Sequence, residues 1–251
     1  MKFKIFNFNY RLLWISIIIV LVLTSCKKEE EKPKPTLNNN QVNLEVSHFW
    51  HGKRINSINQ EILFGEGQKV KPTSLAVILS NFEFSNGSQK LKPQEQALII
   101  SPDKPVRVLS LGNQTIPSNC NQFSFTVGLD STINYQDPLK LPQNHELFRP
   151  DMHWAWNPKA GYKFIRLEAV LNDSIRITYH YAHSKNKVDL RLISQRFFNA
   201  VTPIKLKIDW GKLLDNINLV QNKTWMTPPN ETEILNQLKF NLQKNQVFTL
   251  E

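Results

Sequence analysis

Several features that mark common protein classes are scarce or missing in this sequence. Only 2 cysteines, Cys26 and Cys120, occur among 251 residues, so a disulfide framework cannot be the basis of the fold. Glycines number 8, and no glycine-rich phosphate loop, dinucleotide fingerprint, G-x-S-x-G or H-E-x-x-H motif is present. The nucleotide-binding and serine-hydrolase classes therefore have no support.

Acidic residues are fewer than basic ones, and the formal net charge is +10. The lysines are scattered along the chain and accompany no nucleic-acid motif. The charge therefore indicates solubility or attraction to an anionic surface, with no nucleic-acid partner. The carboxylates are scattered too. The candidates for a hydrolytic pair are Asp137, Glu146, Asp151 and Glu168, but spacing alone gives no distance between them.

The N-terminus resembles a bacterial lipoprotein signal. Lys2, Lys4 and Arg11 precede the apolar run LLWISIIIVLVL, which is shorter than the roughly 20 residues of a spanning helix. The run ends in LTSC, which is similar to a lipobox, in which the cysteine is acylated and becomes the new N-terminus. Residues 1–25 are therefore predicted to be a signal peptide and Cys26 the lipidation site. An uncleaved anchor helix is the alternative.

The segment after Cys26, KKEEEKPKPTLNNNQ, is charged and nearly without apolar residues, so residues 26–41 are predicted to be a flexible tether. Its acidic run resembles a surface-export signal, although a solvated linker with no address explains it equally well. Without the three basic residues of 1–25, 28 basic and 21 acidic residues leave a net charge of +7. Residues 42–251 are long enough for one domain with an ordinary core.

Alternating apolar and polar residues predict an all-β fold, an antiparallel sandwich of the jelly-roll or immunoglobulin-like kind. In VNLEVSHFW, His48 shares the parity of the apolar residues and is expected to point inward. In SIRITYHYAH, His180 has the opposite parity to Tyr179 and Tyr181. Further strands are predicted at 75–84, 96–100, 106–109, 122–129, 162–171 and 204–210.

A short helix is predicted to close the chain. Two prolines precede Asn230, and Glu233 follows it at the spacing of a capping box. Apolar residues then fall on one helical face, which predicts that the helix docks on the sandwich. They are Ile234, Leu235, Leu238 and Leu242.

The segment MHWAWNPKAGYKFIRLE, residues 152–168, is the most informative part of the chain. Its thioether, imidazole and indole groups favour metal or oxidation chemistry over acid/base hydrolysis. Trp154 and Trp156 share one face of a strand, so packing alone remains an alternative. Histidines occur in three loose pairs separated by whole strands, and a sandwich could bring such pairs together. They are His48, His51, His145, His153, His180 and His183.

These residues resemble the MbnP family of copper-binding proteins, the partners of methanobactin systems. The family pattern is similar to M-Y/H-W-x-W, then G-Y-x-F, then L-E-G, and later a strand with H-x-G. The chain departs from it at Ala169 and Ala182, which replace glycines, and in the residues before Gly161. The matching residues are Met152, Trp154, Trp156, Gly161, Tyr162, Phe164, Leu167, Glu168 and His180.

The resemblance implies a β-sandwich that binds copper through histidines and a tryptophan oxidised to kynurenine by a partner di-haem peroxidase of the MauG-like type. Trp154 is the first candidate for the oxidised residue and Trp156 the second. His48 and His180 are the expected ligands, and His153 is a third. Met152 offers a thioether that suits Cu(I). Trp156, Tyr162 and Glu168 are expected to support the site.

The sequence thus predicts a lipid-anchored copper-binding protein of the outer membrane, on its periplasmic or cell-surface face, with no catalytic turnover of its own. Its role would be capture or delivery of copper. Two alternatives stay open. A glycan-binding or structural lipoprotein would expose Trp154 and Trp156 as a flat stacking platform, and a hydrolase would need two carboxylates facing across a cleft.

Overall fold

The computed structural model describes residues 40–154, 158–228 and 230–251. All of them belong to one compact unit, Asn38–Glu251. The predicted signal peptide 1–25, the lipidation candidate Cys26, nearly all of the predicted tether, and Trp156 lie outside the described residues. The assignments made for these parts of the chain therefore stay predictions.

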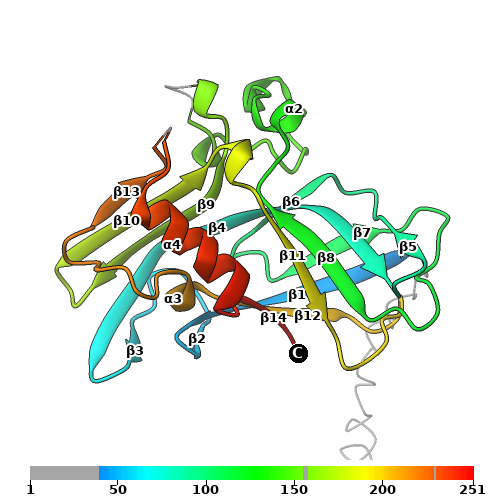
Figure 1. Cartoon of the computed structure of the whole chain (residues 1–251), viewed down its shortest axis with the longest axis horizontal. Coiled ribbons are helices and arrows are strands. Elements are labelled where there is room, and N and C mark those ends of the chain that lie inside the picture. Colours follow the sequence, from blue (N-terminus) through cyan, green and yellow to red (C-terminus); the bar gives the residue numbers. More distant parts are fainter. Residues whose placement is uncertain (1–39, 155–157, 229) are drawn as a thin grey trace, which may run out of the picture. The chain divides into compact units, whose positions relative to one another are not determined.

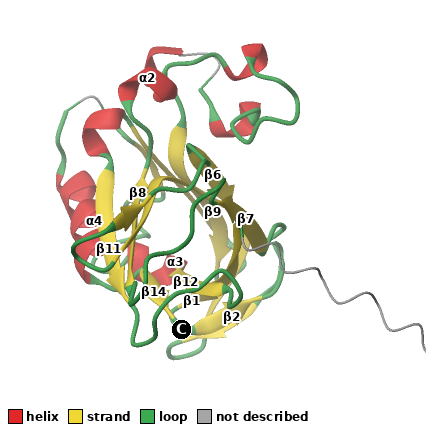
Figure 2. Cartoon of the chain, turned by 90° about the vertical axis from the view of Figure 1, so that its right-hand side faces the viewer, coloured by secondary structure: helices red, strands yellow, loops and turns green. Residues whose placement is uncertain are grey.

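Two β-sheets make up the unit (Figures 1 and 2). The smaller one has the order β14 (Phe248–Leu250), β12 (Ile204–Asp209), β1 (Gln41–Trp50) and β2 (Lys53–Ile55), and β7 (Val106–Ser110) pairs with the first half of β1. The larger one has the order β11 (Val188–Ile193), β8 (Gln122–Val127), β4 (Gln68–Ser85), β9 (Lys163–Leu171), β10 (Ile175–Ala182) and β13 (Thr224–Met226). The short strands β3 (Ile62–Phe64), β5 (Lys90–Leu91) and β6 (Ala97–Ile100) also pair with β4.

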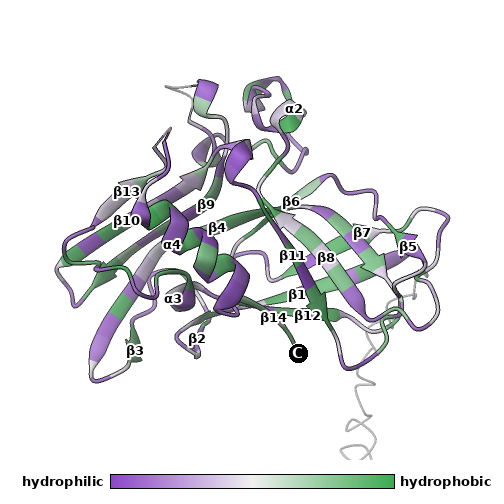
Figure 3. Ribbon diagram, viewed as in Figure 1, coloured by the Kyte–Doolittle hydropathy of each residue, from purple (hydrophilic) through white to green (hydrophobic). Residues whose placement is uncertain are grey.

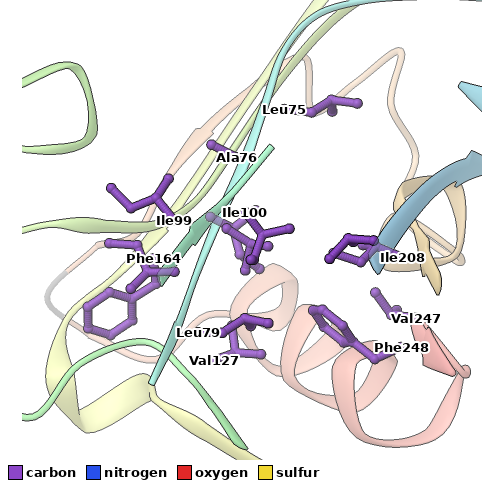
Figure 4. Close-up of a cluster of buried hydrophobic side chains, with 14 of the residues drawn as sticks. Leu75, Ala76, Leu79, Ile99, Ile100, Val127, Phe164, Ile208, Val247 and Phe248 are labelled. Atoms are coloured by element: carbon purple, nitrogen blue, oxygen red, sulfur yellow. The ribbon is translucent and has the colours of Figure 1, made fainter. Parts of the chain in front are cut away.

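Apolar residues of both sheets meet in one hydrophobic core, which Figure 4 shows in part. Phe125 of β8 contacts Phe248 of β14 edge-to-face, with ring centroids 5.4 Å apart. Strand β4 is polar and largely exposed at its start and becomes fully buried from Leu75 to Leu79, a change that Figure 3 shows as purple giving way to green. Burial of these apolar side chains between the sheets supplies the main stabilisation of the fold.

The predicted all-β sandwich with a short C-terminal helix is confirmed. All strands expected from the alternation are present, and most lie within a few residues of their predicted bounds, but β4 begins at Gln68, seven residues before the predicted start at 75. Most pairs are antiparallel, but β1 with β12 and β10 with β13 are parallel. Alternation assigns the faces of a strand and says nothing about the direction of its neighbours, so these two pairs were not foreseen.

The C-terminal helix α4 (Glu233–Lys244) begins after Thr232, whose side chain accepts a hydrogen bond from the Leu235 amide at 3.2 Å. The predicted cap at Asn230 is therefore wrong by two positions, because the hydroxyl directly before the first helical residue satisfies the free amides. Leu235, Leu238 and Leu242 are buried as expected, whereas Ile234 is only half-buried.

Two short helices were not predicted, α2 (Ser131–Asn134) and α3 (Trp210–Leu213). The Asp209 carboxylate caps α3 by accepting hydrogen bonds from Gly211 and Lys212, and it also accepts the amides of His51 and Gly52. Single-turn 3-10 helices occur at Pro138–Lys140, Pro150–Met152, Pro158–Ala160 and Ser184–Asn186. Within the described residues, none of the helices has the length and apolar character needed to cross a membrane.

Cys120 is a buried free thiol whose Sγ lies 3.2 Å from the Ser85 carbonyl oxygen. Burial raises the pKa of this thiol. The Cys120 side chain therefore behaves as a small apolar core residue.

Candidate metal centre

His180 lies on the outer face of the larger sheet. Its neighbours in β10, Tyr179 and Tyr181, point into the core as the alternation predicted. Residues on an outer face are normally exposed to solvent, yet His180 is only 6% exposed. The cover includes Trp154, which is 5% exposed and whose ring lies 6.4 Å from the His180 imidazole.

Gly161 allows Trp154 to reach this position. The Trp154 amide donates to the Gly161 carbonyl at 3.1 Å, and an isolated bridge pairs His153 with Tyr162. Gly161 has a φ of +70°, and a Cβ there would lie about 2.5 Å from the Asn134 side chain. Only glycine combines that backbone conformation with so little space. The G-Y step of the sequence therefore folds the tryptophan segment back over the sheet.

His183 is a second histidine at the same indole, and it is not among the ligands that the sequence predicts. Its imidazole lies 6.1 Å from the Trp154 ring. In a continued strand, His180 and His183 would point to opposite faces. Strand β10 ends at Ala182, however, and His183 adopts a φ of +70°. This turn places both imidazoles beside Trp154, and Ala182 packs against the same indole.

A chain of charged groups begins at the Nε2 atom of His180. The Nε2 atom of His180 lies 2.9 Å from Glu168 Oε1, which also accepts a hydrogen bond from Arg166 Nε at 2.8 Å. Arg166 contacts Asp151 at 3.3 Å, and Arg149 binds Asp151 through two nitrogens at 2.8 and 2.9 Å. The register of β9 and β10 brings Glu168 and Arg166 to this face.

This network fixes the charges around the imidazole. The hydrogen bond with His180, together with Arg166, lowers the pKa of Glu168 to about 2. The Arg149 guanidinium likewise lowers the pKa of Asp151. Because ionised Glu168 can only accept, His180 Nε2 carries the proton. In the neutral form of the ring, the other nitrogen, Nδ1, then keeps its lone pair, and it is buried without a hydrogen-bond partner.

Strand β13 supports the backbone of the two histidines. The Thr227 hydroxyl donates to the His180 carbonyl at 3.0 Å and accepts from the Ala182 amide at 2.8 Å. Met226 is the register partner of His180, as expected from the parallel pairing of β10 and β13 that Figure 1 shows at the sheet edge. Met226 is 45% exposed, so its side chain is open to solvent next to the covered histidine in the sheet.

The neighbouring predicted residues have mainly packing contacts. Met152 is fully buried in the main core, and Tyr162 donates its hydroxyl to the Leu147 carbonyl at 2.9 Å. His153 is buried against the Tyr162 ring, with centroids 4.9 Å apart, and neither of its ring nitrogens has a hydrogen-bond partner. Burial lowers the pKa of His153.

His48 lies in the other sheet and belongs to a different pair. It points inward as predicted, and its Nδ1 accepts a hydrogen bond from Trp210 Nε1 at 3.1 Å, with the two rings stacked. Burial lowers the pKa of His48 to about 4. Among the described residues, no hydrogen bond, ion pair or ring contact links His48 to His153 or His180.

No group of three or more His, Cys, Asp or Glu side chains in the described part of the chain has the spacing of a metal site. What the structure does assemble is a pair of imidazoles around one indole, with a lone-pair nitrogen aimed away from its carboxylate partner. The burial of Trp154 does not provide the flat exposed platform that a glycan-binding module requires. Glu168 and Asp151 are bridged by Arg166, so they are not a facing pair across a cleft.

The sequence profile of the MbnP family matches residues 39–232. The chain belongs to the MbnP family. Among solved structures, MbnP from Methylosinus trichosporium is similar, with a TM-score of 0.49 and 12% sequence identity over 75% of this chain and 81% of that one. No curated protein sequence matches the chain. The predicted resemblance to this family is confirmed.

Proposed function

We propose that this MbnP-family chain is a lipid-anchored, extracytoplasmic copper-binding protein, and that its metal centre forms around Trp154, His180 and His183. The observation that carries the proposal is the buried indole of Trp154 with two imidazole rings close to it, at ring distances of 6.4 and 6.1 Å. Capture or delivery of copper outside the cytoplasm, without catalytic turnover, is the role that such a binding site would serve.

The donor chemistry fits copper. Imidazole nitrogens are good ligands for copper in either oxidation state, and a thioether favours Cu(I). Histidines that bind metals commonly give their second N–H to a carboxylate, which fixes the tautomer and orients the ring. His180 has this arrangement, since Glu168 accepts a hydrogen bond from the Nε2–H group and Nδ1 remains available to the metal. Met226, the register partner of His180, adds a thioether, a soft ligand, to this region of the sheet.

A third nitrogen ligand would come from Trp154. Indole has an N–H donor and no basic nitrogen, whereas opening its pyrrole ring to kynurenine gives an aromatic amine beside a ketone. That change adds oxygen and releases the ring carbon as formate, so it needs an external oxidant. We assign this step to peroxide used by a partner di-haem peroxidase. Trp156 remains the second candidate for the oxidised residue.

Copper titration of matched variants tests the ligand assignment. His180→Ala and His183→Ala should each weaken copper binding strongly, while His145→Ala, which removes a half-buried histidine whose Nδ1 accepts from the Leu147 amide, should have no effect. His48→Ala tests the ligand first expected from the sequence. A wild-type affinity in both His180→Ala and His183→Ala would show that the metal binds elsewhere.

Mass spectrometry of the protein from its native host tests the modification and the anchor. A Trp154 peptide that has lost one carbon and gained one oxygen is expected, and an N-terminal peptide that begins at an acylated Cys26. Material made without the partner oxidant should keep tryptophan and serves as the control. If the native and control peptides are identical, the kynurenine assignment is wrong.

A further inference from the structure

A groove of about 700 Å³ opens far from the histidine cluster, between the loop that joins β11 to β12 and the edge formed by β12 and β14. Three large apolar residues at or near it, Ile193, Phe197 and Val201, are each more than half exposed. Two cations, Arg196 and Lys205, line it and have no carboxylate partner within the described residues. The one acidic residue of the lining, Glu251, pairs with Lys207 at 3.2 Å.

We propose that this groove and its loop are a docking surface for the anionic membrane to which the chain is anchored. Exposed aromatic and aliphatic side chains beside unpaired Arg and Lys are the composition of a surface that lies in the headgroup region. Basic residues near an anionic bilayer are attracted to its surface. Contiguous exposed apolar side chains also call for a covering partner.

The groove lies near Asn40, where the tether joins the described domain, and this position favours the membrane as the partner. β1 and β12 are parallel, with Leu44 opposite Ile204, so the loop before β12 lies at the same end of the domain as Asn40. Figure 1 shows this loop and the start of β1 at one end of the described domain. The 13 residues 27–39 separate Cys26 from this point, and they can span at most about 45 Å. An acylated Cys26 would therefore hold this end of the domain within that distance of the bilayer, where its exposed apolar and basic residues can reach the headgroups. The inference rests on the proposed lipid anchor.

Docking in this way would turn the histidine cluster away from the lipid. Strand β4 runs from one region to the other. Its residue Ala76 pairs with Arg166, which belongs to the histidine cluster, and its residue Phe84 pairs with Phe123, near the end of the domain that holds the groove. Eight residues of strand correspond to roughly 26 Å. The metal centre would then face the aqueous compartment, where copper and a partner oxidant can reach it.

Depth-dependent quenching on the full lipidated chain tests the surface. Because Cys120 is buried and Cys26 is acylated, a single cysteine introduced by Phe197→Cys can be labelled with bimane. Leu63→Cys is the matched control, since Leu63 is 58% exposed against 61% for Phe197 and lies on β3, away from the chain entry. The vesicles contain phosphatidylcholine, phosphatidylglycerol and doxyl-labelled lipid.

The label at position 197 should lose its fluorescence on these vesicles, and the label at position 63 should keep it. Arg196→Gln with Lys205→Gln should reduce that loss on anionic vesicles toward the level on phosphatidylcholine alone. Equal signals from the two positions on vesicle-bound protein would overturn the docking surface.

Two further readouts separate the alternatives. Flotation with vesicles of phosphatidylcholine alone, to which the basic residues are not attracted, should be lost in Cys26→Ser; flotation that survives there would refute the lipid anchor without touching the quenching result on anionic vesicles. A blue shift of the 197 label in Cys26→Ser protein without vesicles, growing with protein concentration, would instead assign the groove to a second copy of the chain and overturn the membrane assignment.

Discussion

Two histidine–tryptophan pairs occupy the two sheets, and they differ in how the imidazole is satisfied. In the smaller sheet, Trp210 donates directly to Nδ1 of His48, so the lone pair of that nitrogen is engaged inside the core, while Nε2 is buried without a hydrogen-bond partner. In the larger sheet, Glu168 binds Nε2 of His180, and Nδ1 is left without a hydrogen-bond partner on a ring that lies 6.4 Å from the indole of Trp154. The same two residue types therefore form a packing unit in one place and a candidate binding site in the other. The direction of the hydrogen bond decides which, because a ligand nitrogen must keep its lone pair free.

The surroundings of the two pairs differ in the same sense. Trp210 is part of the continuous core between the sheets. Trp154 belongs to a small separate cluster with Ala160 and Ala182, on the outer face. A pair that carries stability should respond to substitution mainly through unfolding, and a pair that carries function mainly through ligand affinity.

The largest expected effect is on folding. Trp210→Ala should lower the free energy of unfolding by about 3–5 kcal/mol, because it leaves a cavity in the core and an unpaired buried imidazole. Trp154→Ala removes a side chain of the same size from the smaller cluster and should cost clearly less. Urea unfolding followed by circular dichroism measures both. Equal losses would mean that the Trp154 pair is a core element as well.

The second effect separates the pairs by pH. The folded-state pKa of His48 is about 4, below the ordinary 6.5, so the unfolded chain binds more protons between these values. Stability should therefore be intact above about pH 6.5 and fall by up to about 3 kcal/mol as the pH drops to 4. In His48→Gln, which keeps an acceptor but does not titrate, that loss should shrink.

Part of the acid loss should remain in His48→Gln, because burial also lowers the pKa of His153 and His183. The measurement is the urea midpoint at several pH values for both proteins. Parallel curves for wild type and variant would show that His48 does not titrate as its burial implies.

The third effect concerns the carboxylate behind His180. Glu168→Gln should weaken copper binding by about 10–100-fold, the usual result of removing the group that orients a metal-binding histidine. Glu146→Gln is the matched control, because Glu146 also pairs with an arginine and its side chain is 23% exposed against 25% for Glu168. Competition titration with a Cu(I) chelator reports both affinities. A loss of the same size in the two variants would point to a general effect of charge.

The sequence was sufficient to predict which side chains of a strand point inward, but it did not predict which other segments of the chain cover the outer face. Alternation correctly placed His48 inside and His180 outside, since parity depends only on the local chain. It could not show that Trp154 folds over His180, because that depends on the positive φ of Gly161 and the crowding at Asn134. His183 was missed for the same reason, as its place depends on one left-handed residue at the end of a strand.

Long-range partners were equally hidden. Trp210 bonds to His48 across 162 positions of the chain, and β13 and β14 are only three residues long. Alternation needs more residues than that to be recognised. The parallel register that brings Met226 and Thr227 beside His180 therefore became visible only in the folded chain.

The smallest expected effect concerns the Thr227 hydroxyl, which hydrogen-bonds the backbone that carries His180 and His183. Thr227→Val keeps the volume of the side chain but removes the hydroxyl that joins the His180 carbonyl to the Ala182 amide. The loss of these buried hydrogen bonds should cost about 1–2 kcal/mol of unfolding free energy. Copper affinity should fall by less than in Glu168→Gln, because the imidazole of His180 keeps its carboxylate partner and only the turn that carries His183 is loosened. Unfolding and copper titration on the same preparation would show both changes. A copper affinity that falls further than in Glu168→Gln would mean that the strand end, and with it His183, contributes more to the site than the carboxylate does.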